Sequence, residues 1–169
     1  MAYLEAGDTE RALQLLQAES ADAFVSMPYD NTWLISLTTL AWVAIELRAA
    51  LPAQQLFDLL APYHEQLPAV SIGGNPPVAC YLGGLASVLG RFDEAENYFI
   101  EATELNTHGR MKFAAAWTQL LWGRMRAVRS SPGDTERARE LLTSAQTAAA
   151  AHGYANIERR ATEALARLD

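Results

Sequence analysis

Apolar residues recur along almost the whole chain at the spacing that places them on one face of a helix, with polar residues between them. Turn signals rich in Gly, Pro, Asn and Asp separate these segments, and none shows sustained alternation of β-branched residues. The pattern therefore predicts an all-α protein. The predicted helices span residues 1–6, 9–20, 32–48, 52–63, 77–89, 93–105, 111–129, 134–151 and 155–168.

The boundaries of these helices follow from capping and turn chemistry. Asp8 comes after a glycine and is expected to cap the helix that begins at Thr9. The stretch 21–31 contains Pro28 and is predicted to be an irregular connector. Glycines and prolines within 68–77 are expected to end one helix and start the next, with a proline at its first position.

A short pattern ending in a small residue recurs four times. Its alanines are spaced 41, 42 and 43 residues apart, and a bulky apolar residue follows each of them four positions later. A fixed period in this range is typical of stacked helical hairpins. The alanines are Ala12, Ala53, Ala95 and Ala138, and the bulky residues are Leu16, Phe57, Phe99 and Leu142.

The predicted helices form about four antiparallel pairs and one last helix, within a single helical-repeat domain over 1–169. The last helix, 155–168, is apolar on one face and charged on the other, as expected of the cap of a repeat array. The first hairpin begins with only about six residues of its first helix. We therefore expect the chain to be a fragment of a longer array, the alternative being a naturally short first helix.

The third hairpin carries a pattern that resembles the tetratricopeptide repeat: Leu82, Gly83, Gly90, Phe92, Ala95, Phe99 and Ala102. Its small residues let paired helices approach closely, and its phenylalanines fill the groove between hairpins. The resemblance implies a right-handed superhelix of antiparallel hairpins, in which the first helices line a concave groove. Because the period exceeds the usual 34 residues, the helices should be longer than in a standard repeat.

A wider resemblance covers most of the chain, on 33–41, 56–63, 82–91, 95–99, 115–117 and 133–142. These segments look like the C-terminal repeat region of large bacterial signalling ATPases, including LuxR-type transcriptional regulators of the MalT kind and cyclase-linked ATPases. The Leu-Leu-Ala-Pro-Tyr sequence at 59–63 is the most specific part. The resemblance implies a module that senses a partner or an inducer. The chain has no phosphate-binding Gly-Lys-Ser/Thr loop and no recognisable helix-turn-helix, so ATP hydrolysis and DNA binding are not assigned to it.

Composition excludes several classes of function. The chain has 20 acidic and 13 basic residues, a net charge of −7, which disfavours binding to nucleic acid. No apolar run is long enough to cross a membrane, and the N-terminus lacks the features of a signal peptide, so we expect a cytoplasmic protein. The single cysteine, Cys80, is expected to be a buried, inert thiol and excludes an internal disulfide.

The aromatic and arginine residues on the first helices are the candidate contacts. Trp33 and Trp117 are expected in the hairpin core, whereas the spacing of Trp42 and Trp122 leaves core packing and groove exposure both open. Three arginines follow Trp122; they either grip an acidic peptide or carboxylate or form a solvated helix end. The candidate groove or partner contacts are Trp42, Tyr81, Trp117, Trp122, Arg124 and Arg126.

Other polar residues give no sign of catalysis or of a cofactor. His64, His108 and His152 lie at predicted helix ends and fit no metal-binding motif. The carboxylates of 93–96 and of Glu101 and Glu104 are expected to form solvated helix faces. We therefore expect a non-enzyme without a cofactor.

The prediction for function is a non-catalytic protein-interaction or sensor module with a protein or peptide partner. The alternative is an effector domain that holds a small-molecule inducer where Tyr81, Trp117 and Arg124 converge on an apolar pocket. Apolar side chains around Leu4, Leu13 and Leu16 should remain partly uncovered and support a weak homodimer, unless 21–31 folds over them.

Overall fold

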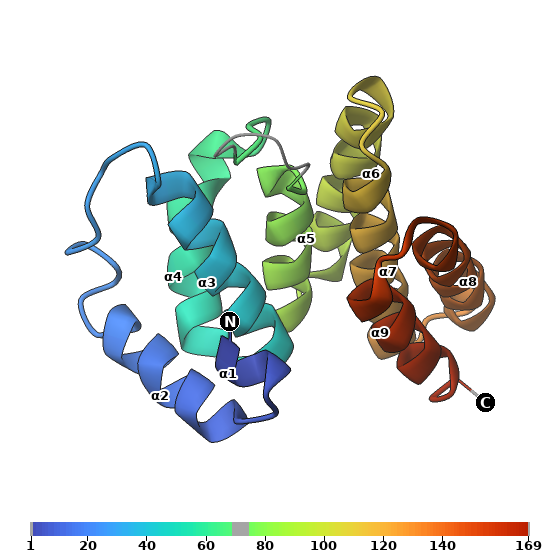
Figure 1. Ribbon diagram of the computed structural model, residues 1–169, viewed down its shortest axis with the longest axis horizontal. Helices are drawn as coiled ribbons and strands as arrows, with labels where there is room; N and C mark the ends of the chain where they lie inside the picture. Colours follow the sequence, from blue (N-terminus) through green and yellow to red (C-terminus); the bar gives the residue numbers. More distant parts are fainter. Residues whose placement is uncertain (1, 69–74, 169) are drawn as a thin grey trace.

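The computed structural model describes residues 2–68 and 75–168, and every regular element within these ranges is a helix (Figure 1). The prediction of an all-α fold is therefore confirmed. The elements are α1 (Ala2–Glu5), α2 (Thr9–Ser20), α3 (Trp33–Leu47), α4 (Ala50–Leu60), the 3-10 turn η1 (Ala61–Tyr63), α5 (Val78–Val88), α6 (Phe92–His108), α7 (Lys112–Arg129), α8 (Asp134–His152) and α9 (Ala155–Leu165).

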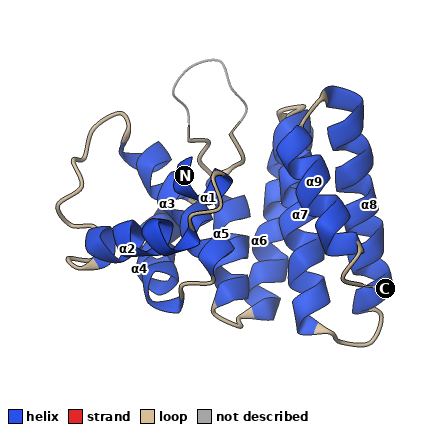
Figure 2. Cartoon of the chain, turned by 60° about the horizontal axis from the view of Figure 1, so that its bottom comes forward, coloured by secondary structure: helices blue, strands red, loops and turns tan. Residues whose placement is uncertain are grey.

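The helices stack in two layers along the chain (Figure 2). Helices α3, α5, α7 and α9 contact one another in that order, and we call them the odd layer. Each of α4, α6 and α8 packs against the two odd-layer helices that flank it in sequence, while α2 packs against α3 and α4. We call these four helices the even layer.

The four alanines of the repeated pattern are buried, and so are the bulky residues that follow them, as predicted. The odd and even layers approach closely at these positions. A Cβ atom added at Gly83 would lie 2.8 Å from the ring of Phe99, and one added at Gly123 would lie 2.7 Å from Leu142. Because real Cβ contacts are not so short, a larger residue at either crossing would force Phe99 or Leu142 to shift.

Most helix boundaries agree with the predictions within a few residues. Asp8 caps α2 as expected, since its carboxylate accepts a hydrogen bond from the Arg11 backbone at 3.0 Å. Helix α6 extends three residues past its predicted end, because Asn106 is buried and donates to the Thr118 hydroxyl of α7 at 2.9 Å. The glycines predicted to form the break before Asn75 lie outside the described residues.

The N-terminal helices differ from the expectation at one position. Leu16 is buried, whereas its neighbour Leu15 is 41% exposed. The connector 21–31 places Phe24 in the core and Met27 beside a hollow between α2 and α3. The connector thus covers only part of this face. Within the described residues, no helix combines the length and the apolar character needed to cross a membrane.

Candidate ligand-binding pocket

Aromatic side chains from three odd-layer helices surround a hollow of about 440 Å³, which we call the aromatic pocket. Its aromatic walls are Trp42 of α3, Tyr81 of α5, Phe113 and Trp117 of α7, and Tyr154 in the turn before α9. Asn75, Pro76 and the remaining residues of 153–157 complete the lining. A hollow of this size accommodates a small organic molecule.

The local sequence places Tyr154 at this site. Gly153 ends α8 in the left-handed conformation, with φ 74°, which glycine adopts without strain. The chain then reverses, and the Tyr154 backbone N–H donates to Ala149 at 2.9 Å. Helix α9 follows at once, so that Ile157 on its first turn lies against the pocket.

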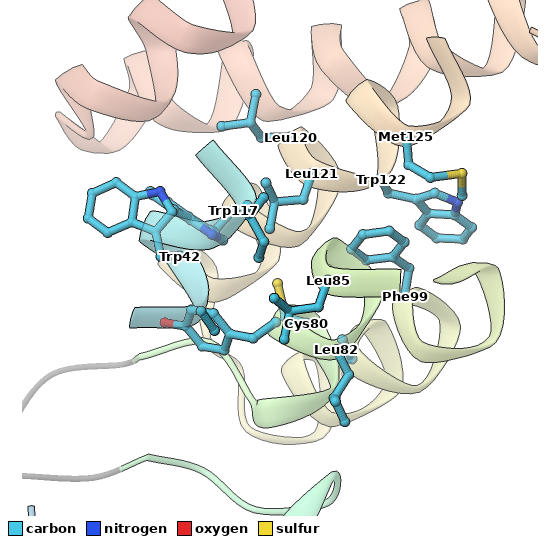
Figure 3. Close-up of a cluster of buried hydrophobic side chains, with 14 of the residues drawn as sticks. Trp42, Cys80, Leu82, Leu85, Phe99, Trp117, Leu120, Leu121, Trp122 and Met125 are labelled. Atoms are coloured by element: carbon cyan, nitrogen blue, oxygen red, sulfur yellow. The ribbon is translucent and has the colours of Figure 1, made fainter. Parts of the chain in front are cut away.

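The rings that form the pocket brace one another. Trp42 and Trp117 meet edge to face, with ring centroids 5.0 Å apart (Figure 3). Phe113 lies 6.0 Å from Trp117 and meets Tyr154 edge to face at 5.2 Å. Edge-to-face pairs of this kind add stabilisation beyond the burial of their surface. The walls are therefore set before any ligand enters.

Two hydrogen-bond donors in these walls are unused. The Nε1 atoms of Trp42 and Trp117 are buried and have no partner among the described residues, although each side chain is only 6% exposed. Buried polar groups are usually paired, and an indole nitrogen can only donate. These two nitrogens are therefore unsatisfied donors buried within the aromatic walls.

The aromatic pocket contains no side chain that is charged at neutral pH. Burial raises the pKa of the Tyr81 phenol, which keeps it protonated. Burial also raises the pKa of the Cys80 thiol, one residue before it, to about 12. The prediction of a buried, inert Cys80 agrees with this environment. The arrangement suits apolar and aromatic binding better than acid–base or nucleophilic chemistry.

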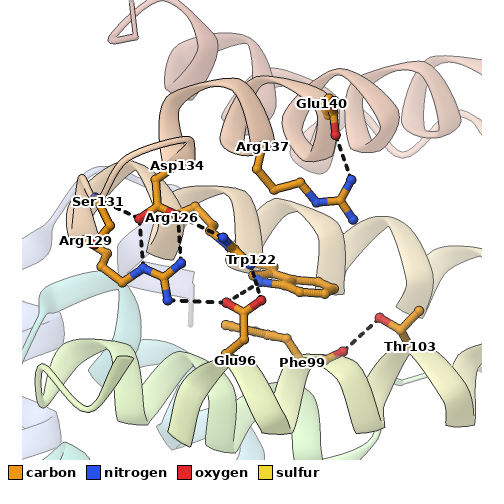
Figure 4. A network of polar contacts seen from close by, with 10 residues as sticks. All are labelled: Glu96, Phe99, Thr103, Trp122, Arg126, Arg129, Ser131, Asp134, Arg137 and Glu140. Carbon is orange, nitrogen blue, oxygen red and sulfur yellow. Dashed lines mark hydrogen bonds and ion pairs between the residues drawn. The ribbon is translucent and has the colours of Figure 1, made fainter. Parts of the chain in front are cut away.

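Trp122 and Arg126, two of the predicted contact residues, lie away from the aromatic pocket. Trp122 stacks on Phe99, and Figure 3 shows this pair at the opposite end of the buried cluster from Trp42. Arg126 and Arg129 both bind the carboxylate of Asp134, at 2.9 and 2.7 Å (Figure 4). Within the described part of the chain, both arginines of this cluster therefore hold internal carboxylates.

The carboxylate of Glu96 was expected to be solvated, and the structure corrects this. Glu96 accepts a hydrogen bond from the Trp122 indole at 3.1 Å and pairs with Arg126. The network joins α6, α7 and the first turn of α8 (Figure 4). Hydrogen bonds from Arg129 hold the pKa of Asp134 well below its usual range, although burial acts in the opposite direction.

Arg124 was expected to converge with Tyr81 and Trp117, but it lines a different hollow. Its Nη1 atom lies 2.6 Å from Glu46 Oε1, and the same carboxylate pairs with Arg160 of α9. The Arg160 guanidinium in turn lies 5.3 Å from the ring centroid of Trp42. The predicted contact residues thus separate into three groups, of which only Trp42, Tyr81 and Trp117 share the aromatic pocket.

The histidines lie at or just beyond helix ends, as predicted. His64 follows η1, and its Nδ1 atom lies 2.6 Å from Glu101 of α6, so this glutamate is paired rather than simply solvated. His108 and His152 end α6 and α8. The described residues bring together no group of three side chains that could hold a metal ion.

Phe113, Tyr154 and the Glu46–Arg160 pair were not singled out from the sequence. Phe113 lies one helical turn before Trp117, and this spacing could have marked it as a neighbour on the same face. Tyr154 follows a helix-ending glycine, which gives no hint of where the reversed chain points. Glu46 and Arg160 are 114 residues apart, so no local pattern connects them.

Comparison of the chain with protein-family models, with curated proteins and with solved structures finds no match.

Proposed function

We propose that this chain is a non-catalytic binding module, built as a tetratricopeptide-like superhelix, that holds a small molecule in the aromatic pocket. The two stacked layers and the glycine crossings at Gly83 and Gly123 support the repeat architecture. In such an array the odd layer faces the concave side. The pocket then lies where helical-repeat proteins bind their ligands.

The aromatic pocket is the observation that carries this proposal. Its rings come from segments far apart in sequence, are braced edge to face, and line a hollow of about 440 Å³ without a charged lining residue. Concave, mostly apolar hollows of this size with a few polar groups are typical of small-molecule sites. The braced aromatic walls therefore favour a binding site here.

We further propose that the module acts as a sensor within a bacterial signalling protein in the cytoplasm. The resemblance of segments such as 56–63 and 82–91 to regulatory ATPases supports this role. Binding of the small molecule, rather than chemistry, would then be the signal. The net charge of −7 disfavours nucleic acid as a partner of this segment.

The test is a calorimetric titration with 2-naphthaleneacetamide, a neutral two-ring aromatic amide. We expect saturable one-to-one binding that weakens about tenfold in Tyr154→Ala, because that variant loses one aromatic wall. Tyr29→Ala is the control, since Tyr29 is exposed and lies outside the pocket. Failure of the wild-type chain to bind, or equal weakening in both variants, would contradict the proposal.

A protein partner is the second candidate function, and the hollow between α2 and α3 favours it. This hollow measures about 590 Å³ and is lined mainly by apolar side chains, among them Tyr3, Leu15 and Ile35. Tyr3 and Leu15 are both exposed. Exposed apolar surface of this kind is typical of a protein contact. For the isolated chain we propose a second copy as the partner, in a weak two-fold dimer.

A further inference from the structure

A second hollow lies beside the aromatic pocket, and its lining has the opposite character. It measures about 280 Å³ and is mostly polar. Four arginines and two glutamates line it, which gives a local excess of positive charge in a chain of net charge −7. We call it the arginine pocket. Its arginines are Arg124, Arg159, Arg160 and Arg167.

The two pockets are lined by residues one helical turn apart on two helices. On α3, Trp42 lines the aromatic pocket and Glu46, four residues later, lines the arginine pocket. On α9, Asn156 and Arg160 repeat this relation, and Arg160 Nε donates to Asn156 Oδ1 at 2.8 Å. Four residues of helix rise about 6 Å, so a small molecule can span both pockets.

Part of the positive charge is compensated and part is not. Glu46 is 13% exposed and takes up one N–H of Arg124, whose guanidinium has five. Arg124 is 31% exposed and therefore keeps donors that face solvent. Arg167 is exposed and has no ion-pair partner among the residues that the structure describes. Arg167 and the remaining N–H groups of Arg124 are available to an anion, whereas Arg160 pairs with Glu46 and Arg159 with Glu163.

We propose that the ligand is a small aromatic anion whose ring enters the aromatic pocket while its carboxylate binds Arg124 and Arg167. This inference rests on the proposed function, because it needs the aromatic pocket to be a binding site. Carboxylates bind guanidinium groups through charge-assisted hydrogen bonds, which are stronger than neutral ones.

A cationic ligand fits the same geometry less well. Aromatic walls attract cations over their ring faces, but Arg160 already lies over Trp42. The aromatic pocket has no carboxylate to compensate a second cation. The adjoining arginines would repel it.

The experiment compares three probes that share one ring system: 2-naphthaleneacetate, its neutral amide 2-naphthaleneacetamide, and 2-(2-naphthyl)ethylammonium. Each is titrated calorimetrically into the full chain at neutral pH. We expect the carboxylate to bind about tenfold tighter than the amide at low ionic strength, and the ammonium to bind most weakly. The advantage of the carboxylate should shrink at about 0.5 M salt, because the arginine pocket is partly open to solvent.

Two exposed arginines supply a matched pair of variants. Arg167→Gln should weaken binding of the carboxylate roughly threefold to tenfold and weaken the amide clearly less, because the amide carries no charge. Arg11→Gln on α2 removes the same charge from a surface outside both pockets and should change neither affinity. Both positions are exposed, so both variants should fold.

The outcomes separate the two proposals. Equal binding of the carboxylate and the amide, tighter binding of the ammonium, or equal effects of the two arginine variants overturns the anion inference and leaves the aromatic pocket standing. Absence of binding by all three probes overturns the proposed function together with this inference. Tighter carboxylate binding that depends on Arg167 supports both.

Discussion

At the scale of single residues, the crossing between α5 and α6 depends on the absence of one methyl group. A Cβ at Gly83 would meet the Phe99 ring, which is fully buried and stacked on Trp122. The ring has little room to move, because neighbours confine it from the other side. The same relation recurs between Gly123 and Leu142.

We expect Gly83→Ala to destabilise the fold by about 1–3 kcal/mol, because the added methyl overpacks the crossing. On helix propensity alone the same change would stabilise the fold by about 1 kcal/mol. The sign of the change in the free energy of unfolding, measured by chemical denaturation, therefore distinguishes the two effects. Ser144→Ala, at an exposed position of α8, should change stability by no more than about 0.5 kcal/mol. A stabilised Gly83→Ala variant would show that the layers are not closely packed there.

Asp134 provides a second prediction at this scale, in the dependence of stability on pH. Its side chain is 1% exposed and bound by Arg126 and Arg129, and hydrogen bonds from Arg129 lower its pKa in the folded state. A depressed pKa contributes stability above the unfolded value of about 3.9 and loses it as the pH falls toward the folded value. Asp134→Asn should therefore be clearly less stable at pH 7.

The stability difference between wild type and Asp134→Asn should shrink progressively as the pH falls below about 4. Denaturant unfolding at several pH values gives this difference directly. Glu104→Gln on the exposed face of α6 is the control and should leave the stability close to that of the wild type throughout. A difference that stays constant down to pH 2 would mean that the Asp134 charge does not contribute.

At the scale of the elements, Glu46 attaches the last helix to the rest of the odd layer. It holds Arg124 of α7 and Arg160 of α9 at once, across three helices. Removing one partner from a mostly buried ion pair leaves uncompensated charge, which is strongly destabilising. The pair therefore fixes the position of the helix that walls the aromatic pocket.

In Glu46→Gln we expect faster hydrogen exchange in α9, because the contact between α9 and α3 is weaker. The free energy of unfolding should fall by about 1–3 kcal/mol. Exchange measured by mass spectrometry on peptides from α9 and from α2 localises the effect. Glu163→Gln is the matched control, because it breaks an exposed pair with Arg159 that contributes little. Equal exchange in the two variants would contradict this role of Glu46.

Periodicity and turn chemistry were enough to predict the helices, since local sequence determines both. The buried anchors such as Ala95 and Phe99 were also predictable, because the period itself marks them. The site was predictable only in part. Trp42, Tyr81 and Trp117 were named, but the role of Arg124 depends on Glu46, which lies 78 residues away in the chain. Contacts between distant helices leave no local pattern.

At the scale of the whole molecule, the exposed hollow between α2 and α3 predicts self-association. Sedimentation should show a concentration-dependent dimer that Leu15→Glu abolishes, since a charge at an apolar contact cannot be solvated there. Leu51→Glu, at the exposed start of α4, is the control and should still dimerise. A strict monomer across the micromolar range, with all three proteins alike, would contradict the proposed dimer.

The turn at Gly153 makes the last helix part of the proposed binding site. Tyr154 and Ile157 belong to the segment that closes the chain's final hairpin, and the same residues form one side of the aromatic pocket. A ligand present at a hundred times its dissociation constant stabilises the binding-competent state by about 2.7 kcal/mol. That free energy favours the docked form of α9 over any loosened form. Ligand binding in the aromatic pocket would then make α9 more ordered, without a large movement of the helix.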